Sequence, residues 1–306
     1  MFKKRICLLL ALVLCAAVIL PAAADSTPAI YKVTDSEGHV IWLMGTVHTT
    51  TDDCYPIAGI AEILDECDVL VLESVSQEDA QADAASDLIS GFLMPEGNGL
   101  SEELLSRVSD AFVSHGVDAL APYTPYLSPS GLLLFLNMFF LNDAFGGETH
   151  SVEEHLIALA AERGLELRGM ENAGSQAEAV SSLNAIDGDS AVASLQAILD
   201  DPDSVGADRR EMMEMWRSGD VDALLEFTRG TLDMAESESE GERELYRKTL
   251  GDRNTFFAQG ALDLLAGGGR ALMAVGCLHI VDPATGVIRQ LEDAGCTVER
   301  VYAEAQ

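Results

Sequence analysis

Two histidines, each three residues after a glycine, stand where the sequence indicates chemistry. His48 ends the run "VIWLMGTVH" and His279 ends the run "ALMAVGCLH" near the other end of the chain. A third Gly-x-x-His, at Gly147–His150, follows a helical pattern, so the spacing alone carries little weight. What indicates function is the shared context of His48 and His279, in which an apolar run precedes the glycine.

Two glutamates follow apolar runs in the same way. Glu73 comes after "VLVL" (Val69–Leu72) and Glu171 comes after "LELRGM" (Leu165–Met170). In open α/β sheets, ligands bind at the carboxyl ends of the strands. Two imidazoles and two carboxylates at that edge can hold a divalent cation or form a general acid/base cluster without one. The alternative for both histidines is a structural role, capping a turn or lying in the core.

The glycines before the two histidines are expected to support this site. Gly45 and Gly276 each come directly after an apolar run. Glycine at such a point permits a tight turn and lets a ligand approach the backbone closely.

Other catalytic patterns are missing from the sequence. It contains no H-E-x-x-H, no G-x-S-x-G and no Walker phosphate loop. His150 and His155 are five positions apart, which puts them about 140° apart around a helix, so "HSVEEH" is not a metalloprotease helix. His39 and His115 are expected in a turn and at a helix end.

The elements that must position these residues follow from hydrophobic patterns. Four apolar runs do not alternate, which is typical of strands covered on both faces. They span 40–44, 69–72, 165–170 and 271–275, and an alternating run at 296–303 suits an edge strand. Helical patterns fill 101–116, 151–164, 194–201, 211–232 and 253–269. We predict an α/β fold with a mostly parallel central sheet flanked by helices. A largely helical insertion is expected at about 76–254, interrupted by one strand near 165–170.

Two middle segments have unusual composition. Gly131–Asn142 is strongly apolar but too short to span a bilayer, so it is interpreted as a buried helix. The alternative is an exposed groove wall or a lid that touches a membrane. The acidic stretch Ala235–Glu244 is interpreted as a solvated loop or helix end.

The first 24 residues have the layout of a cleavable signal peptide. Three cationic residues precede an apolar run, and small residues up to Ala24 offer a cleavage site. We expect a secreted or extracytoplasmic protein in which 25–306 form a single domain. Lipid anchoring at Cys15 is not favoured, because bulky Leu14 precedes it. No transmembrane span is expected in the mature chain.

Charge and cysteine content limit the partners. The 306 residues carry a formal net charge of −33, which repels nucleic acid and anionic lipid headgroups. The simplest interpretation is an acidic surface that keeps an exported protein soluble. Four cysteines follow the leader, and their order suggests disulfides Cys54–Cys67 and Cys277–Cys296.

Several segments together resemble one family. They are "YKVTDSEGHVIWLMGTVHTT", "VLVLES", "ELRGMENAGSQ", "MWRSGDVDALLEF" and the stretch from "YRKTLGDRN" to "GCTVERV". They follow the order of the TraB/GumN family, to which the Tiki Wnt-cleaving metalloproteases are related. The resemblance runs from Tyr31 to about Val301 and is thin from about Gln77 to Thr149.

The resemblance implies roles for particular residues. His48 and His279 would be the paired motif histidines and metal ligands, with Glu73 as acidic ligand or general base. Glu171 matches the family's "Gly-Leu-Glu", where this chain has Met170 in place of leucine. The family pattern also covers Gln176, a supporting residue, and Arg253 with Asn254, which match "Glu-Arg-Asn" with Asp252 replacing the acid.

The implied chemistry is hydrolysis assisted by a divalent ion, with manganese, cobalt or zinc as the candidates. The ion would activate water for attack on an amide of a peptide or protein substrate. Arg253 would stabilise negative charge or bind a carboxylate, and Asn254 would orient a neighbour. A structural cluster at a helix N-terminus is the alternative for this pair. Two other functions use the same residues: a non-enzymatic protein that sequesters a peptide or pheromone, and a metal-independent His/Glu hydrolase.

Overall fold

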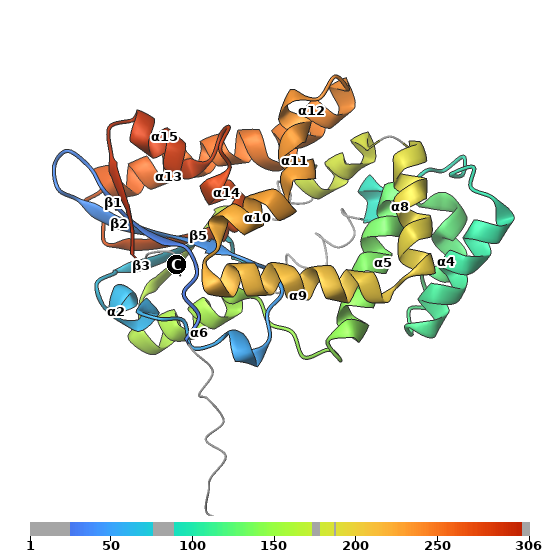
Figure 1. The fold of residues 1–306 in the computed structure, drawn as a ribbon, viewed down its shortest axis with the longest axis horizontal. Coiled ribbons are helices and arrows are strands. Elements are labelled where there is room, and N and C mark those ends of the chain that lie inside the picture. Colours follow the sequence, from blue (N-terminus) through green and yellow to red (C-terminus); the bar gives the residue numbers. More distant parts are fainter. Residues whose placement is uncertain (1–24, 76–88, 173–177, 187, 302–306) are drawn as a thin grey trace, which may run out of the picture.

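A six-stranded mixed sheet lies at the centre of the fold, in the order β4-β3-β5-β2-β1-β6 (Figure 1). The computed structural model describes residues 25–75, 89–172, 178–186 and 188–301, so the expected leader lies outside the described residues. Strands β4, β3, β5 and β2 run parallel, while β1 pairs antiparallel with β2 and β6. Their bounds are Ile30–Thr34, Val40–Thr46, Val69–Ser74, Glu166–Glu171, Ala271–Gly276 and Thr297–Arg300, for β1 to β6.

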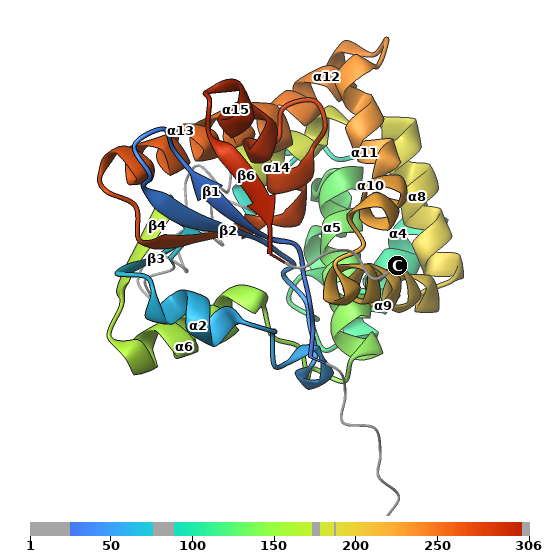
Figure 2. The same cartoon turned by 60° about the vertical axis from the view of Figure 1, so that its left-hand side comes forward.

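Helices cover both faces of this sheet, which confirms the predicted α/β class. Side chains alternate between the faces along each strand. On one face Leu70 and Leu72 pack with α2 (Ile60–Asp65) and α6 (Val152–Arg163). On the other face Val69 and Val71 pack with α13 (Asp252–Ala266) and α15 (Val287–Asp293) (Figure 2). A strand that is buried on both faces needs apolar residues at every position, which is why "VLVL" does not alternate.

The remaining helices belong mostly to the middle of the chain. The α-helices are α4 (Glu102–Ser114), α5 (Pro129–Ala144), α8 (Gly188–Asp200), α9 (Asp203–Ser218), α10 (Val221–Phe227), α11 (Arg229–Asp233), α12 (Glu240–Tyr246) and α14 (Cys277–Val281). Short 3₁₀ turns span Asp52–Cys54, Ala121–Tyr126, Ser182–Ala185 and Met234–Glu236, and a π-helical turn spans Arg247–Gly251. The acidic stretch is therefore divided between a 3₁₀ turn and the start of α12.

Two strands differ from the prediction. The sequence analysis did not predict β1, a short strand with mixed polarity that forms a hairpin with β2 through a turn containing His39. The run at 165–170 forms β4, but the expectation that it is covered on both faces was wrong. It lies at the edge of the sheet with most residues exposed. The alternating run at the end forms the other edge strand, β6, as predicted.

A separate helical cluster lies beyond the sheet and is built from α4, α5 and α8 (Figure 1). The apolar segment Gly131–Asn142 forms most of α5 and buries Leu132, Phe135, Leu136 and Phe140 there. This confirms the buried-helix interpretation. Among the described residues, no helix combines the length and the apolar composition needed to cross a membrane.

The four described cysteines are free thiols, so the suggested pairings Cys54–Cys67 and Cys277–Cys296 were wrong. Cys54 and Cys67 pack inside the core beneath the sheet. Burial raises the pKa of the Cys67 thiol to about 12, which keeps it protonated at neutral pH.

Neighbouring phenylalanines of α13 allow a test of this packing. Phe257 is 0% exposed in the core between the sheet and α13, whereas Phe256 is 49% exposed. We expect Phe257→Ala to lower the free energy of unfolding by about 3–5 kcal/mol, because it removes a buried ring and leaves a cavity. Phe256→Ala is the matched control and should cost less than about 1 kcal/mol. Urea unfolding measures both, and equal losses would contradict the described packing.

Candidate active site at the strand ends

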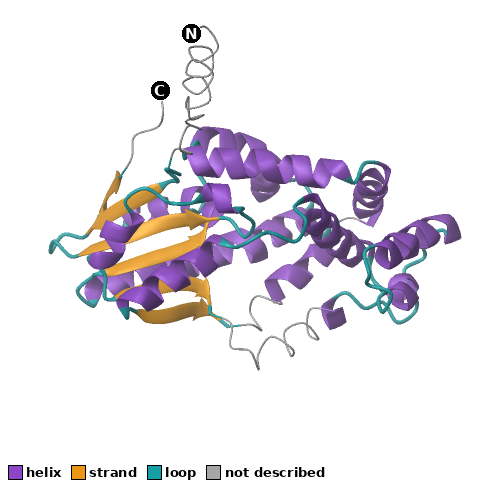
Figure 3. Cartoon of the chain, turned by 90° about the horizontal axis from the view of Figure 1, so that it is seen from below, coloured by secondary structure: helices purple, strands orange, loops and turns teal. Residues whose placement is uncertain are grey.

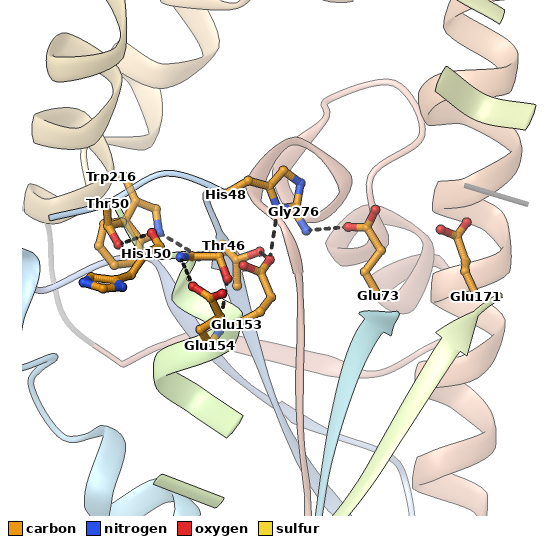
Figure 4. Close-up of polar contacts among 12 residues, drawn as sticks. Thr46, His48, Thr50, Glu73, His150, Glu153, Glu154, Glu171, Trp216 and Gly276 are labelled. Atoms are coloured by element: carbon orange, nitrogen blue, oxygen red, sulfur yellow. Dashed lines mark hydrogen bonds and ion pairs between the residues drawn. The ribbon is translucent and has the colours of Figure 1, made fainter. Parts of the chain in front are cut away.

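The parallel register brings the predicted site residues to one edge of the sheet. Thr46 of β2 pairs with Gly276 of β5, and Ser74 of β3 pairs with Glu171 of β4. The carboxyl ends of these strands point toward the helical cluster (Figure 3). Glu73 and Glu171 stand side by side at the ends of β3 and β4 (Figure 4). The predicted convergence of the four strand ends is therefore present.

Arg253 joins the two glutamates. Its Nε and Nη2 atoms donate to the two carboxylate oxygens of Glu171, at 2.8 and 2.7 Å, and Nη2 also donates to Oε1 of Glu73. All three side chains are shielded, with exposed fractions of 17% for Arg253, 9% for Glu73 and 6% for Glu171. Buried carboxylates need such a partner, because an unpaired buried charge is costly. The guanidinium is thus directed at the protein's own carboxylates.

The start of α13 fixes the position of Arg253. A π-helical turn, Arg247–Gly251, leads into the helix, and such turns occur frequently at functional sites. Nη1 of Arg253 donates to the carbonyl oxygen of Thr249, at 3.3 Å. The guanidinium also lies 5.5 Å from the ring centroid of Phe257. These contacts hold Arg253 between the ends of β3 and β4.

Glu73 is held by the backbone as well. Its Oε2 accepts the Gly276 N–H at 3.2 Å (Figure 4). Oε1 accepts from Arg253. Burial raises the pKa of the Glu73 carboxyl, but the rings of His279 and His48 and the Arg253 guanidinium together lower it below its usual value. Glu73 is therefore ionised at neutral pH.

Asn254 fixes the tautomer of His279. The Asn254 Nδ2 group donates to Oδ2 of Asp282, at 3.0 Å, so its Oδ1 faces Nδ1 of His279, at 2.6 Å. An amide oxygen only accepts, so Nδ1 of His279 carries the hydrogen and Nε2 keeps its lone pair. Burial lowers the pKa of His279 to about 4, against the opposing effect of Glu73. His279 is therefore a neutral, oriented imidazole at pH 7.

Asp282 supports this arrangement from behind, and the sequence analysis did not find it. Its exposed fraction is 2%. Oδ2 accepts from Asn254, from the Tyr246 hydroxyl at 2.5 Å and from the Thr285 hydroxyl at 2.8 Å. Its position three residues after His279 places it in the same short segment, but nothing in the sequence distinguishes it from the many other aspartates.

His48 has a different environment. It is 69% exposed, and its Nδ1 lies 3.4 Å from Oε1 of Glu153 (Figure 4). The Thr46 hydroxyl donates to the same oxygen at 2.5 Å. The neighbouring Glu153 carboxylate raises the pKa of His48 above its usual value, and the charge of Glu73 adds to this effect. His48 can therefore take up a proton near neutral pH.

Glu153 is the second residue that the sequence analysis missed. It lies in the first turn of α6, beside the capping box of Ser151 and Glu154. One oxygen, Oε2, is buried and has no hydrogen-bond partner among the described residues. The sequence "HSVEEH" does predict a helix start, because Ser151 followed by Glu154 forms a capping box. That this helix start lies beside His48 follows only from the fold.

The structure requires glycine at Gly45 and at Gly276 for different reasons. A Cβ at Gly45 would lie 3.0 Å from the Cα and Cβ atoms of Cys277, so this position is required by close packing. A Cβ at Gly276 would lie 3.6 Å from Oε2 of Glu73 and 4.0 Å from Nε2 of His279. A side chain there would fill the space that these two polar atoms border. The nearest atom to that Cβ would be Cδ2 of His279, at 3.3 Å, so Gly276 leaves room for the side chains of His279 and Glu73.

Residues 29–300 match the model of the TraB/PrgY/gumN family. The chain belongs to this family. The match spans both Gly-x-x-His segments and covers nearly the whole described chain, as the resemblance had implied. No curated protein and no solved structure matches the sequence.

In this TraB/PrgY/gumN family member the predicted site residues are brought together in two groups. Glu73, Glu171 and Arg253 form one, with Asn254 and His279 beside it, while His48 pairs with Glu153. Gln176 lies outside the described residues. Arg253 and Asn254 do form a cluster at a helix N-terminus, and that cluster contacts the site directly.

The pairing of His48 with Glu153 predicts a pKa change. Glu153→Gln removes the carboxylate that stabilises the imidazolium, so the pKa of His48 should fall toward or below that of an ordinary histidine. NMR titration of the His48 ring measures it. Glu154→Gln is the matched control, because Glu154 caps the same helix turn through the Ser151 N–H. An unchanged pKa in Glu153→Gln, or an equal fall in Glu154→Gln, would contradict the pairing.

Proposed function

We propose that the chain is an exported hydrolase that acts on peptide or protein amides, with His48 as general base. The observation that carries the proposal is the imidazole of His48, which is exposed at the strand ends and paired with Glu153 through Nδ1. A histidine oriented by a carboxylate is a frequent arrangement in acid/base catalysis. Membership of the family supports the proposed hydrolase, and the expected leader supports export.

The proton path follows from the pairing of His48 with Glu153. Because the Glu153 carboxylate faces Nδ1, we assign the hydrogen to Nδ1, which leaves Nε2 free to remove a proton from a water molecule. The water oxygen then attacks the carbonyl carbon, and its proton moves to Nε2. The resulting imidazolium is stabilised by Glu153 and returns the proton to the leaving amine when the C–N bond breaks. General base catalysis of this kind contributes about 10²–10⁴-fold.

The other residues fix the positions of the side chains in the site. Glu73 holds the Gly276 N–H and Arg253, and Asn254 keeps His279 in one tautomer. Nε2 of His279 keeps its lone pair and is therefore a hydrogen-bond acceptor beside Glu73. The predicted role of Arg253 toward negative charge on the substrate stays a prediction, because its contacts are with Glu73, Glu171 and Thr249.

The second version of this proposal is hydrolysis assisted by a divalent cation. The donor types of His48, Glu73 and His279 match those of catalytic zinc sites. His279 also has the arrangement of metal-bound histidines, whose other ring N–H is held by an acceptor. In their present spacing the residues do not fit, since among the described residues no three histidine, cysteine, aspartate or glutamate side chains gather closely enough for joint ligation. Glu73 is paired with Arg253 and His48 with Glu153, so both would have to leave these partners before they could bind a cation.

The experiment measures cleavage of a mixed peptide library by the mature chain, with and without chelator. We expect the wild-type chain to cleave and His48→Ala to lose about 10²-fold or more of the rate. His150→Ala is the matched control, because His150 lies in a neighbouring segment that is bridged to Thr50, half-exposed, with its ring toward Asp52. Its rate should stay within about twofold of wild type.

The outcomes separate the versions. Loss of cleavage in chelator, with recovery on adding manganese, cobalt or zinc, would favour the cation version over the metal-independent one. Equal rates in wild type and His48→Ala would remove His48 from catalysis. Peptide binding without any cleavage would contradict hydrolysis and favour the sequestering protein.

A further inference from the structure

Arg209 lies on the inward face of α9. At about 100° per residue, it is about 40° from Met213 and about 20° from Trp216 around the helix. Met213 and Trp216 pack into the core beneath the sheet, while Val205, one turn earlier, packs against the helical cluster. Arg209 therefore lies between the two cores, on the face that both use, and is only partly exposed.

The end of α9 is tied to the strand that leads to His48. Nε1 of Trp216 donates to the carbonyl oxygen of Gly45 in β2, at 2.8 Å. Two helical turns separate Trp216 from Arg209, a distance of about 10 Å along the axis. This places Arg209 over the region beyond the strand ends, where His48 and Cys277 lie. Both of these residues interact electrostatically with its guanidinium.

Arg209 has no carboxylate partner in the part of the chain that the structure describes. It makes no hydrogen bond, ion pair or ring contact with a described residue. Most other described arginines face an acid, as Arg217 faces Asp53 and Glu214 on the same helix. An unpaired guanidinium that is partly withdrawn from water is costly, and an arriving oxyanion would relieve this cost.

The contrast with Arg253 indicates which cation is available to a ligand. Arg253 is occupied by Glu73 and Glu171. Arg209 keeps its planar fork of donors, which matches a carboxylate in bidentate fashion. In a chain with net charge −33, an unpaired cation near the proposed general base gives this edge a charge opposite to that of the chain as a whole.

We propose that Arg209 binds a carboxylate of the peptide ligand and thereby makes the site selective for peptides that carry one close to the bond at His48. The inference rests on the proposed peptide-directed function. The carboxylate can be the C-terminal group or an acidic side chain, and both sources present the same planar oxyanion.

The test compares three pools of acetylated hexapeptides of mixed neutral sequence. One ends in a free carboxylate, one in an amide, and one in an amide with a single internal glutamate. The full mature chain carries His48→Ala in every arm, so that binding is measured without cleavage, by ultrafiltration and mass spectrometry. We expect at least one carboxylate pool to bind about tenfold more tightly than the plain amide pool.

The decisive variants are neighbours on α9. Arg209→Gln should reduce the ratio of affinities for the carboxylate and amide pools to about one. Arg209→Lys should keep part of this preference, since lysine retains the positive charge but lacks the planar guanidinium. Arg210→Gln is the matched control, because it removes the same charge from an exposed residue whose contact is the Phe145 ring. It should leave the preference unchanged. Circular dichroism checks that each variant is folded. If Arg209→Gln does not fold, Arg209→Lys becomes the test variant.

Three results would overturn the proposal: no preference in the parent chain, a preference retained in Arg209→Gln, or an equal loss in Arg210→Gln. If Arg209→Gln does not fold, full retention of the preference in Arg209→Lys overturns bidentate binding. Because the assay needs no turnover, a chain that fails to hydrolyse peptides can still confirm it. A chain that cleaves peptides with no carboxylate preference overturns this inference alone.

Discussion

The buried guanidinium of Arg253, held between Glu73 and Glu171, is the interaction on which the site depends. Two carboxylates at the ends of adjacent parallel strands repel each other. Arg253 offsets this repulsion and ties the start of α13 to the ends of β3 and β4. Because Asn254 is the next residue, the same anchoring directs its amide toward His279.

The two Gly-x-x-His segments are similar in sequence but different in environment. His279 is buried, neutral and fixed by Asn254, which is in turn supported by Asp282. His48 is exposed and paired with Glu153. An oriented acceptor and a proton carrier at one sheet edge suit hydrolysis better than two equivalent groups would. This asymmetry is the reason for assigning proton transfer to His48.

Much of this arrangement could be predicted because it depends on local patterns. Unalternating apolar runs identified three covered strands, and the rule that ligands bind at carboxyl strand ends placed Glu73 and both histidines together. Glu153 and Asp282 were missed because their roles arise from contacts between distant segments or from burial in a network. The exposure of β4 was missed although Glu166 and Arg168 interrupt its apolar residues, which distinguishes it from the uniformly apolar start of β3. The suggested disulfides rested on order along the chain, which does not determine distance.

A double-mutant cycle on Arg253 and Glu171 tests the central pairing most directly. Arg253→Met, Glu171→Gln and the double variant would be unfolded in urea, with chelator present. The account predicts a coupling free energy of about 1 kcal/mol or more, because either single change leaves a buried charge without its partner. Losses that add to within about 0.3 kcal/mol would contradict it, and would show that Arg253 does not hold the two strand ends together.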